Sequence, residues 1–330
     1  MENKEIRFAS RPTGIPTADN FQLLETDIPQ PAEGEVLLKT LFISVDPYLR
    51  GRMRDTKSYI APFVVGQVIE SGLVAEVIES KAAEFKAGDL VTGMLGWRLF
   101  NVVPAIALHK VVPGVPPSAN LGVLGVTGLT AYFGLLDIGE PKPGETVVVS
   151  GAAGAVGMSA CQIAKIKGCR VVGIAGSDEK NKYLRDELKV DATVNYRTAD
   201  VFEALQEACP EGVDIYFDNV GGPVSDAAIR LINNGARVPL CGQISMYCSD
   251  KPDTGLRPQP FLLIRSAMMK GFIITSYMPR FAEGISQLAQ WFMSGQLKHK
   301  ESIVEGFDNT PRAFIGLFTG ENIGKQIVKL

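Results

Sequence analysis

The sequence is poor in the side chains that most often carry catalysis. Its 330 residues include only two histidines, His109 and His299, and five cysteines without any Cys-x-x-Cys spacing. Neither histidine has neighbours suited to metal binding, so zinc catalysis is excluded and no metal is expected. The absence of a Gly-x-Ser-x-Gly turn excludes a Ser-His-Asp hydrolase of the α/β type. The odd number of scattered cysteines favours reduced thiols in a cytoplasmic protein.

Strong charge of either sign and uninterrupted apolar runs are also missing. The formal net charge is -3 and the isoelectric point is about 5.6, so no basic surface for nucleic acid or for an anionic membrane is expected. Residues 111–136 carry no charge, but prolines and glycines interrupt them too often for a membrane helix. We expect a buried segment at a domain junction instead. The N-terminal stretch MENKEIRFASRP is not apolar, so no secretory signal is predicted.

Two textures divide the chain, whose length exceeds the size at which a single hydrophobic core keeps growing. Up to about residue 120 there are short β-rich runs, such as GEVLLKTLFISV and GQVIESGLVAEVI, separated by Gly, Pro and Asp. The tail ends in the apolar run GKQIVKL, which is expected to pair with this first region. We predict a β-rich substrate and catalytic domain over residues 1–123 and 295–330, and a second domain over residues 124–294.

The second domain alternates apolar strands with amphipathic helices. Runs such as TVVVS and CRVVGIA are followed by helical segments such as MSACQIAKIKG. This alternation predicts right-handed βαβ units and a doubly wound parallel sheet, so the fold class is α/β. Strands are expected at residues 146–150, 169–175, 191–196, 213–220, 236–242 and 271–276, and helices at residues 158–168, 178–188, 202–208 and 225–234.

A glycine-rich turn, SGAAGAVG, follows the first of these strands. Its fingerprint positions are Ala152, Gly154 and Gly157, an Ala-x-Gly-x-x-Gly variant. Gly154 would let the backbone approach a pyrophosphate, Gly157 would let the helix pack on the strand, and the helix N-terminus would supply N–H donors. A tight turn that holds no ligand is the alternative. The valine-rich strand before the turn and the amphipathic helix after it favour a dinucleotide site.

The end of the second strand indicates which dinucleotide fits. NAD would need an acidic residue there, but the strand ends in Ala175, Gly176 and Ser177. Asp178 is expected to cap the next helix rather than to bind ribose. The small residues leave room for a 2′-phosphate that Lys180 could neutralise. The residues therefore favour NADP, with a solvated helix face as the alternative role of Lys180.

Several motifs, in the same order, resemble the zinc-independent medium-chain dehydrogenase/reductases over essentially the whole chain. They are SVDPYLRGRM (44–53), GLTAYFGLL (128–136), GAAGAVG (151–157), GSDEK (176–180), FDNVGG (217–222), CGQISMY (241–247) and GENIGKQIVK (320–329). The chain is most similar to the group of leukotriene B4 12-hydroxydehydrogenase/prostaglandin reductase, plant alkenal double-bond reductases and bacterial curcumin reductase. The resemblance implies a Rossmann sheet, a smaller GroES-like catalytic domain, and a homodimer formed through the edge strand near residues 271–276.

The resemblance also implies how NADP is held. Lys180 and Tyr196 match the family's lysine and tyrosine at the 2′-phosphate, and Asn219 lies beside the nicotinamide half. Thr130 matches a threonine near the carboxamide in related quinone reductases, and Gln67 fills the position of the zinc enzymes' histidine. The full set of expected cofactor-binding residues is Thr130, Gly154, Ala155, Val156, Gly157, Lys180, Tyr196, Asn219, Cys241, Gly242, Ile244, Ser245, Tyr247, Phe272, Ile273, Ile274 and Asn322.

By resemblance, the reaction is hydride delivery from NADPH to the β-carbon of an α,β-unsaturated aldehyde or ketone. In the family the enolate-like oxygen is stabilised by the nicotinamide ribose 2′-hydroxyl and in some members by a tyrosine, and protonation of the α-carbon completes reduction of the C=C bond. We select Tyr48 as the catalytic, substrate-facing donor, with simple packing after a proline turn as its alternative. Ile264 stands where some members carry a second tyrosine and cannot donate a hydrogen bond. Arg50 and Arg52 are expected to be structural.

Two other functions fit part of the same pattern. A quinone oxidoreductase of the same superfamily, or a non-catalytic NADPH-binding protein, would retain the glycine turn and Lys180. The SVDPYLRGRM segment favours the alkenal branch over the quinone branch. The sequence therefore predicts an NADPH-dependent 2-alkenal/enone reductase whose partner is a small-molecule enal or enone.

Overall fold

The computed structural model describes residues 2–330 and separates into two compact units. The first unit combines the described residues up to Leu121 with Glu301–Leu330, and the second unit is Gly122–Lys300. Among the described residues, no helix is long and apolar enough to cross a membrane. The uncharged stretch includes a short 3-10 helix, Pro117–Leu121, and helix α2, Val126–Phe133, most of whose residues are buried.

The second unit is built on a six-stranded parallel sheet. Its strands lie in the order β10-β9-β8-β11-β12-β13, so the strand order reverses between β8 and β11. The strands are β8 (Thr146–Ser150), β9 (Arg170–Ala175), β10 (Ala192–Asn195), β11 (Val213–Phe217), β12 (Ile232–Leu240) and β13 (Met268–Gly271). The predicted α/β class with a doubly wound parallel sheet is confirmed.

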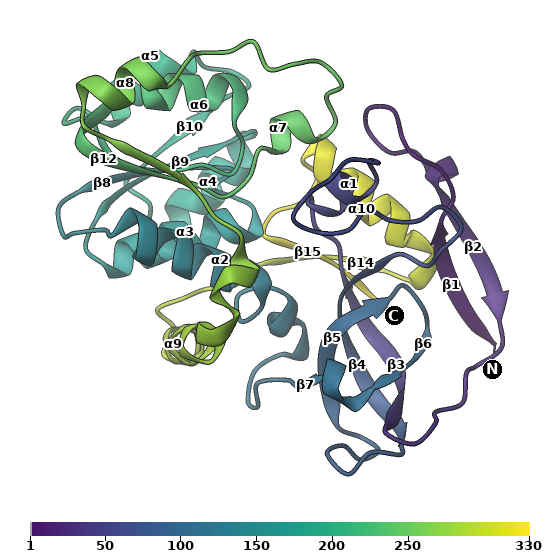
Figure 1. Ribbon diagram of the computed structural model, residues 1–330. Helices are drawn as coiled ribbons and strands as arrows, with labels where there is room; N and C mark the ends of the chain where they lie inside the picture. The colour runs from purple at the N-terminus through teal and green to yellow at the C-terminus, as the bar shows by residue number, and fades with distance from the viewer. Residues whose placement is uncertain (1) are drawn as a thin grey trace. The chain divides into compact units, whose positions relative to one another are not determined.

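Helices cover both faces of this sheet. Figure 1 shows α2 and α3 on one face and α5 and α6 on the other. The helices after α2 are α3 (Ala155–Ile166), α4 (Asp178–Asp186), α5 (Val201–Ala208), α6 (Gly222–Ile229), α7 (Ile244–Tyr247), α8 (Gln259–Ile264) and α9 (Phe281–Met293). Because helices pack on both faces, strand residues are buried on both sides, and all five residues of β8 are buried. The continuous apolar runs of the sequence are the consequence.

The last strand of this sheet was predicted in the wrong place. It was expected at residues 271–276, but β13 ends at Gly271 and a 3-10 helix, Ile274–Arg280, follows. The apolar letters FIIT resemble a strand because they could be buried in a sheet. Phe272 is half-buried and packs elsewhere: a Cβ added at Gly134 would lie 2.4 Å from its ring, so the ring packs on the end of α2. The chain leaves the sheet at this point to begin α9.

The fourth predicted helix, at residues 225–234, was too long at its C-terminal end. Helix α6 ends at Ile229, and Ile232 already begins β12. Asn233 fixes the change of structure, because its Nδ2 donates a hydrogen bond to Asp214 Oδ1 (2.9 Å) on the neighbouring strand β11. Ile232 pairs with Val213 of β11, so this segment joins the parallel sheet instead of adding a further helical turn.

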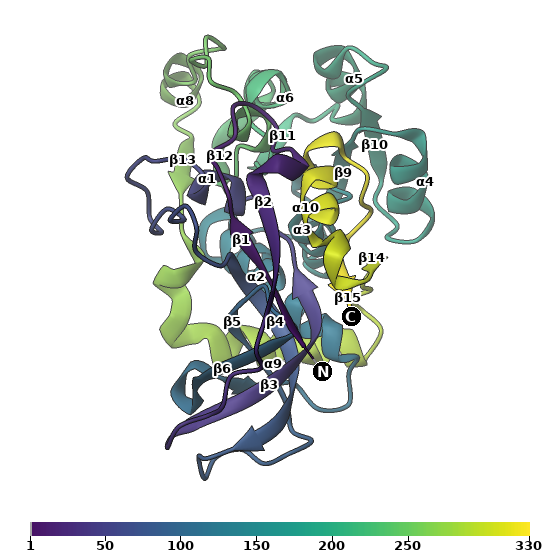
Figure 2. The same ribbon diagram turned by 90° about the vertical axis from the view of Figure 1, so that its right-hand side faces the viewer.

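The first unit is mainly β-structure. Strands β1 (Asn3–Phe8) and β2 (Phe21–Thr26) form an antiparallel pair, which Figure 2 shows side by side. The other sheet has the order β14-β15-β3-β4-β5-β7, with β6 also paired to β3. The strands of this sheet are β3 (Glu35–Ser44), β4 (Glu70–Ser80), β5 (Leu90–Gly96), β6 (Phe100–Pro104), β7 (His109–Lys110), β14 (Glu301–Glu305) and β15 (Lys325–Lys329). The unit also contains the α-helices α1 (Leu49–Arg52) and α10 (Thr310–Thr319). The C-terminal run pairs with β3 as predicted for the tail.

An aromatic cluster forms the centre of the first unit's core. Trp97 and Phe314 are both fully buried, and their ring centroids lie 6.4 Å apart in an edge-to-face arrangement. Trp97 Nε1 donates a hydrogen bond to Ser71 Oγ (2.8 Å), and Ser71 Oγ in turn donates to the carbonyl of Ser44 (2.7 Å). The core therefore joins the C-terminal helix α10 to the end of strand β3.

Candidate functional site

The carboxyl ends of the six parallel strands lie at one edge of the second unit's sheet. Apart from Thr130, every cofactor-binding residue predicted in this unit lies in a segment after one of these ends. In chain order the segments are Gly154–Gly157 after β8, Lys180 after β9, Tyr196 after β10, Asn219 after β11, 241–247 after β12 and 272–274 after β13. Ligands of open doubly wound sheets bind at this edge, where the strand order reverses.

The glycine-rich turn after β8 has no room for a side chain at Gly157. Gly151 adopts a φ of 58°, in the left-handed region, and α3 begins after Gly154. A Cβ added at Gly157 would lie 2.2 Å from the carbonyl oxygen of Gly151 and 2.7 Å from the Cα of Ala152. No side chain caps α3, and its first turn holds no acidic residue. The N-terminus of α3 thus presents backbone N–H groups and the positive end of the helix dipole, which is the arrangement that binds phosphate.

Helix α4, which follows β9, is capped by Ser177, a residue that the sequence analysis placed only at the end of the strand. Ser177 Oγ accepts a hydrogen bond from the backbone N–H of Lys180 (3.2 Å). The prediction that Asp178 caps this helix was wrong. Ser177 has the extended backbone of a cap residue, whereas Asp178 is already the first helical residue, and its carboxylate accepts a hydrogen bond from Asn195 Nδ2 (2.8 Å).

Positive charge gathers at the ends of β9 and β10. A Cβ added at Gly176 would lie 2.7 Å from the hydroxyl oxygen of Tyr196, so this tyrosine lies against the turn that leads into Lys180. The Arg197 guanidinium lies 5.9 Å from the centroid of the Tyr196 ring. Burial, and then the charge of Arg197, lower the pKa of Lys180. The sequence reasoning missed Arg197, whose only signal is its position directly after Tyr196.

Asp218, at the end of β11, organises the middle of this edge. Its side chain is fully buried, and Oδ1 accepts hydrogen bonds from the hydroxyls of Ser150 (3.0 Å) and Tyr216 (2.9 Å). The same oxygen accepts from the backbone N–H of Val220 (3.0 Å). Asn219 is held by its Nδ2, which donates to the carbonyl of Ser150 (2.7 Å). The sequence reasoning did not select Asp218, although the FDNVGG motif contains it.

The loop after β12 is held against the same segment. The backbone N–H groups of Cys241 (2.8 Å) and Gly242 (3.0 Å) donate to the carbonyl of Asp218, and Ser245 Oγ donates to the carbonyl of Val220 (2.6 Å). Burial raises the pKa of the Cys241 thiol to about 12. A thiol that keeps its proton is a poor nucleophile, so this loop contributes shape and hydrogen bonds rather than thiolate chemistry.

The remaining predicted positions of the second unit lie on α2 and after β13. The hydroxyl of Thr130 donates to the carbonyl of Val126 (2.7 Å), one helical turn earlier. The ring of Phe272 packs on the end of α2, and Ile273 and Ile274 are half-buried. Their role at a cofactor stays a prediction.

Tyr48 lies in the first unit, at the start of α1 after the buried strand β3. Its side chain is half-buried and packs against the core of that unit. Burial, followed by the negative charge of Asp46, raises the pKa of Tyr48 above its ordinary value. The hydroxyl therefore remains protonated and can act as a hydrogen-bond donor.

The two arginines of the same motif make structural contacts, as expected. Arg50 is fully buried, and its Nη2 donates to the carbonyl of Gly14 (2.8 Å). The Arg52 guanidinium lies over the ring of Phe63, 4.0 Å from its centroid, and its Nε donates to the carbonyl of Ala61 (3.0 Å). Both side chains tie α1 to neighbouring segments of the first unit.

Three further predicted positions lie elsewhere. Asn322 Nδ2 donates to the carbonyl of Gly324 (2.8 Å) in the loop before β15, Gln67 is exposed, and Ile264 is 74% exposed at the end of α8. Within residues 2–330 there is no group of three or more His, Cys, Asp or Glu side chains that could hold a metal ion.

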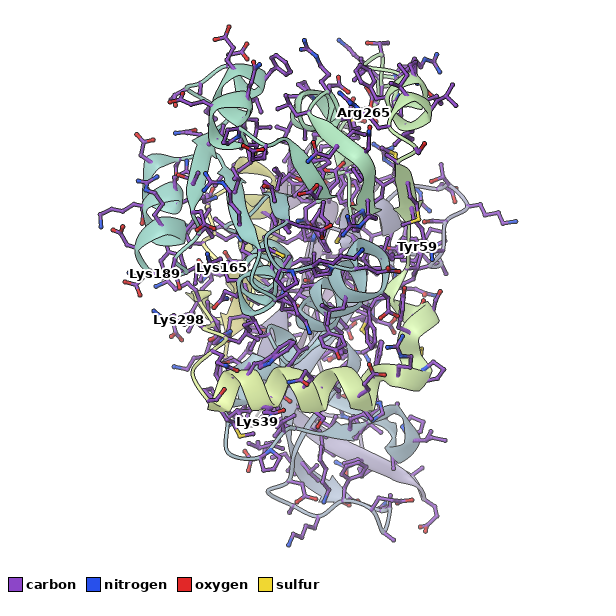
Figure 3. The ribbon with its side chains drawn as sticks, turned by 90° about the vertical axis from the view of Figure 1, so that its left-hand side faces the viewer. Lys39, Tyr59, Lys165, Lys189, Arg265 and Lys298 are labelled. Carbon is purple, nitrogen blue, oxygen red and sulfur yellow. The ribbon has the colours of Figure 1, made fainter. Side chains whose placement is uncertain are left out.

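A hollow of about 300 Å³ opens on another part of the second unit. Lys165, Lys189 and Lys298 line it together with Glu187, and Figure 3 shows these three lysines close together. Acidic side chains already pair with two of them: Asp191 lies 3.0 Å from Lys165, and Glu187 lies 3.1 Å from Lys298. None of the predicted cofactor-binding residues lines this hollow.

Comparison with known proteins assigns the chain to a family. Residues 4–111 match a family described as the N-terminal domain of oxidoreductase, and residues 155–291 match one described as zinc-binding dehydrogenase.

The chain is 56% identical to a Bacillus subtilis (strain 168) protein named as an NADP-dependent oxidoreductase, YfmJ (99% of this chain, 97% of that protein). It is 42% identical to the NADPH-dependent curcumin reductase of Escherichia coli (strain K12), over 100% of this chain and 97% of that protein. The crystal structure of CurA in complex with NADPH from Vibrio vulnificus matches with a TM-score of 0.94 at 45% identity, over 99% of this chain and 98% of that chain. The chain therefore belongs to the zinc-independent medium-chain dehydrogenase/reductase family, in the group that includes the prostaglandin reductases and curcumin reductase.

Proposed function

We propose that the protein is an NADPH-dependent reductase of the C=C bond of α,β-unsaturated aldehydes and ketones. One observation carries the proposal: the segments after all six parallel strands share one edge, and they include a glycine-rich turn, a basic pair and an anchored asparagine. The Escherichia coli relative is named for the NADPH-dependent reduction of curcumin, a molecule with C=C bonds conjugated to carbonyl groups. We propose that this protein also reduces substrates with a C=C bond conjugated to a carbonyl group.

NADPH fits the residues present at this edge. The pyrophosphate would lie at Gly154–Gly157, where a side chain at Gly157 would fill the space that the backbone needs. Lys180, Tyr196 and Arg197 would hold the 2′-phosphate, because two cations that share one region are stabilised by an added dianion. Asn219 would contact the nicotinamide half from its position between the ends of β8 and β11.

The chemistry needs a hydride source and a donor for the developing negative charge. When bound, NADPH supplies a hydride that the substrate accepts at its β-carbon. Negative charge then develops on the carbonyl oxygen, and Tyr48 donates a hydrogen bond to that oxygen. Because burial raises the pKa of Tyr48, its proton stays on the hydroxyl and the residue stabilises the charge without acting as a base. Protonation of the α-carbon from water completes the reduction.

Product analysis tests the proposal. Purified protein is incubated with NADPH and a nine-carbon 2-enal, and the products are identified by mass spectrometry, with NADH as the control cofactor. We expect the saturated aldehyde with NADPH and far less of it with NADH. Oxidation of NADPH with a quinone but not with the enal would indicate a quinone oxidoreductase, and binding without oxidation would indicate a non-catalytic NADPH-binding protein. Either result would refute the proposal.

We also propose that the protein forms a homodimer through β13. This strand is the outermost of the six, so one of its sides pairs with no other strand of the sheet, and three of its four residues are exposed. Exposed apolar side chains lie close to it in sequence on α8, where Leu263 is 81% and Ile264 is 74% exposed. An exposed edge strand is a template for pairing with a second copy. Size-exclusion chromatography with light scattering measures the mass, and a monomer at micromolar concentration would contradict the proposal.

A further inference from the structure

A buried ion pair fastens the turn after β3 to the last strand of the chain. Lys325 is the first residue of β15, and its side chain is only 3% exposed. Its Nζ donates to Asp46 Oδ1 (2.8 Å) and to the carbonyl of Val45 (3.0 Å). Ser44 Oγ donates to the other carboxylate oxygen of Asp46. The pair lies 279 residues apart in the sequence and is brought together because β15 pairs with β3.

An ion pair in this place is not explained by stability alone. Removing two charges from water offsets most of their attraction, so apolar residues of similar size commonly stabilise a core as well. What the pair does supply is fixed geometry, because the position of Asp46 is set by hydrogen bonds to both of its carboxylate oxygens. The backbone continues that constraint: the N–H of Leu49 donates to the carbonyl of Asp46 (3.1 Å), which closes a turn around Pro47 and Tyr48.

The loop before Lys325 is held by hydrogen bonds of its own. Asn322 Nδ2 donates to the carbonyl of Gly324 (2.8 Å). Ser302 Oγ donates to the carbonyl of Ile323 (2.9 Å) and accepts from its N–H (3.0 Å). Loss of the Lys325 charge therefore leaves this loop in place and acts on the Asp46 side of the pair.

We propose that Lys325 is a positioning residue for the reductase reaction, which fixes the orientation of the Tyr48 hydroxyl by clamping Asp46. The inference rests on the proposed function of Tyr48. Lys325 itself donates to a backbone carbonyl and a carboxylate of its own unit, so its effect on turnover passes through the tyrosine.

A double-mutant cycle tests this proposal. Lys325→Gln should lower kcat for a 2-enal about tenfold and change the dissociation constant of NADPH less than about twofold. In a Tyr48→Phe background the same substitution should change kcat less than about twofold, since the hydroxyl that it would misplace is gone. The neutral pair Asp46→Asn/Lys325→Gln should recover most of the lost kcat. The matched control is Lys329→Gln on the same strand, whose lysine is 48% exposed and pairs with Glu305, and it should leave kcat unchanged.

An equal fall of kcat in the wild-type and Tyr48→Phe backgrounds would overturn the proposal, because a purely structural role does not depend on the hydroxyl. If Lys325→Gln does not fold, Lys325→Met, which also removes the charge but keeps the length of the side chain, replaces it in the cycle with the same two expected results. If the protein reduces no enal, the proposed function fails, and the inference is then tested separately by NMR of 13C-labelled tyrosine in the NADPH complex. The Tyr48 resonance, assigned by its loss in Tyr48→Phe, should move in Lys325→Gln and return in the neutral pair. An unmoved resonance would overturn the inference.

Discussion

Two turns of this protein each lead from a buried strand into a helix, and they are built in opposite ways. After β8 the turn consists of small residues, and Gly157 lies so close to the carbonyl of Gly151 that no side chain fits. After β3 the turn is filled with side chains, among them the buried Arg50 and the buried Lys325 that reaches Asp46. The first turn exposes backbone donors at a helix end, and the second fixes one side chain with several others.

The difference teaches which kind of ligand group each turn can recognise. Backbone N–H groups at a helix N-terminus are already oriented by the helix. They therefore suit a phosphate group, which is the same in every cofactor molecule that binds. A side-chain donor such as Tyr48 has rotational freedom, and its orientation must be fixed by neighbours. Substitutions at Gly157 and Tyr48 each break one of these turns, and a substitution at Lys180 tests the phosphate end of the same proposed cofactor.

The largest effect is expected from Gly157→Ala in the first turn. The added Cβ would collide with backbone atoms of Gly151 and Ala152, so the turn must move. We expect NADPH affinity to fall by about a hundredfold or more and the free energy of unfolding to fall by about 3 kcal/mol, measured by fluorescence titration and by denaturant unfolding. The control is Gly51→Ala in the second turn, where no atom lies within 4 Å of the added Cβ. Equal NADPH affinity in Gly157→Ala and the wild type would contradict the close approach of backbone and ligand.

A smaller effect is expected from Lys180→Ala. Loss of one charge-assisted contact, worth roughly 1.5–3 kcal/mol, should weaken NADPH binding by about one to two powers of ten while NADH use hardly changes. Steady-state kinetics with both cofactors measures the ratio. Lys182→Ala is the control on the same helix, because Lys182 is exposed and pairs with Asp186. Equal losses with NADPH and NADH would show that Lys180 does not recognise the 2′-phosphate.

Tyr48→Phe breaks the second turn's proposed function without removing its packing. We expect kcat for enals to fall about tenfold, because a hydrogen bond made in the transition state is lost, while NADPH affinity stays the same. Tyr59→Phe, at an exposed tyrosine of the same unit, should change kcat less than about twofold. Unchanged turnover in Tyr48→Phe would leave the tyrosine with packing alone.

The smallest change is expected with pH. The neutral hydroxyl of Tyr48 is the donor, and burial disfavours the phenolate, so the folded-state pKa lies above the ordinary value of about 10. The donor is therefore present at all pH values below the raised pKa and is lost only above it. We expect kcat to stay level from pH 7 to about pH 10. A fall of kcat with an apparent pKa at or below 10, absent in Tyr48→Phe, would contradict the raised pKa.

The second unit's fold could be predicted because its information is local. Strands buried on both faces read as apolar runs, and the glycine-rich turn lies within eight residues of sequence. One error occurred where a contact distant in sequence decides, and another where two adjacent residues compete for the same role. Phe272 packs on α2 and so ends β13 early, and Ser177 rather than Asp178 has the backbone conformation of a cap.

The first unit's site could be predicted less fully. Tyr48 was selected from the SVDPYLRGRM motif, but nothing near it in the sequence indicates that Lys325 holds Asp46. That contact depends on the pairing of the last strand, β15, with β3, and it joins residues that lie 279 positions apart in the sequence. Arg197 and Asp218 were missed for a different reason: each stands beside a residue that was selected, and only the fold shows what its side chain contacts.

The most direct test follows a labelled hydride. The protein is supplied with NADPH that carries deuterium at the transferable position of C4 and with a nine-carbon 2-enal, and the product is analysed by NMR and mass spectrometry. Reduction of the C=C bond predicts a saturated aldehyde with deuterium on C3, the β-carbon. Deuterium on C1 of an unsaturated alcohol, or an enal recovered without deuterium, would contradict it.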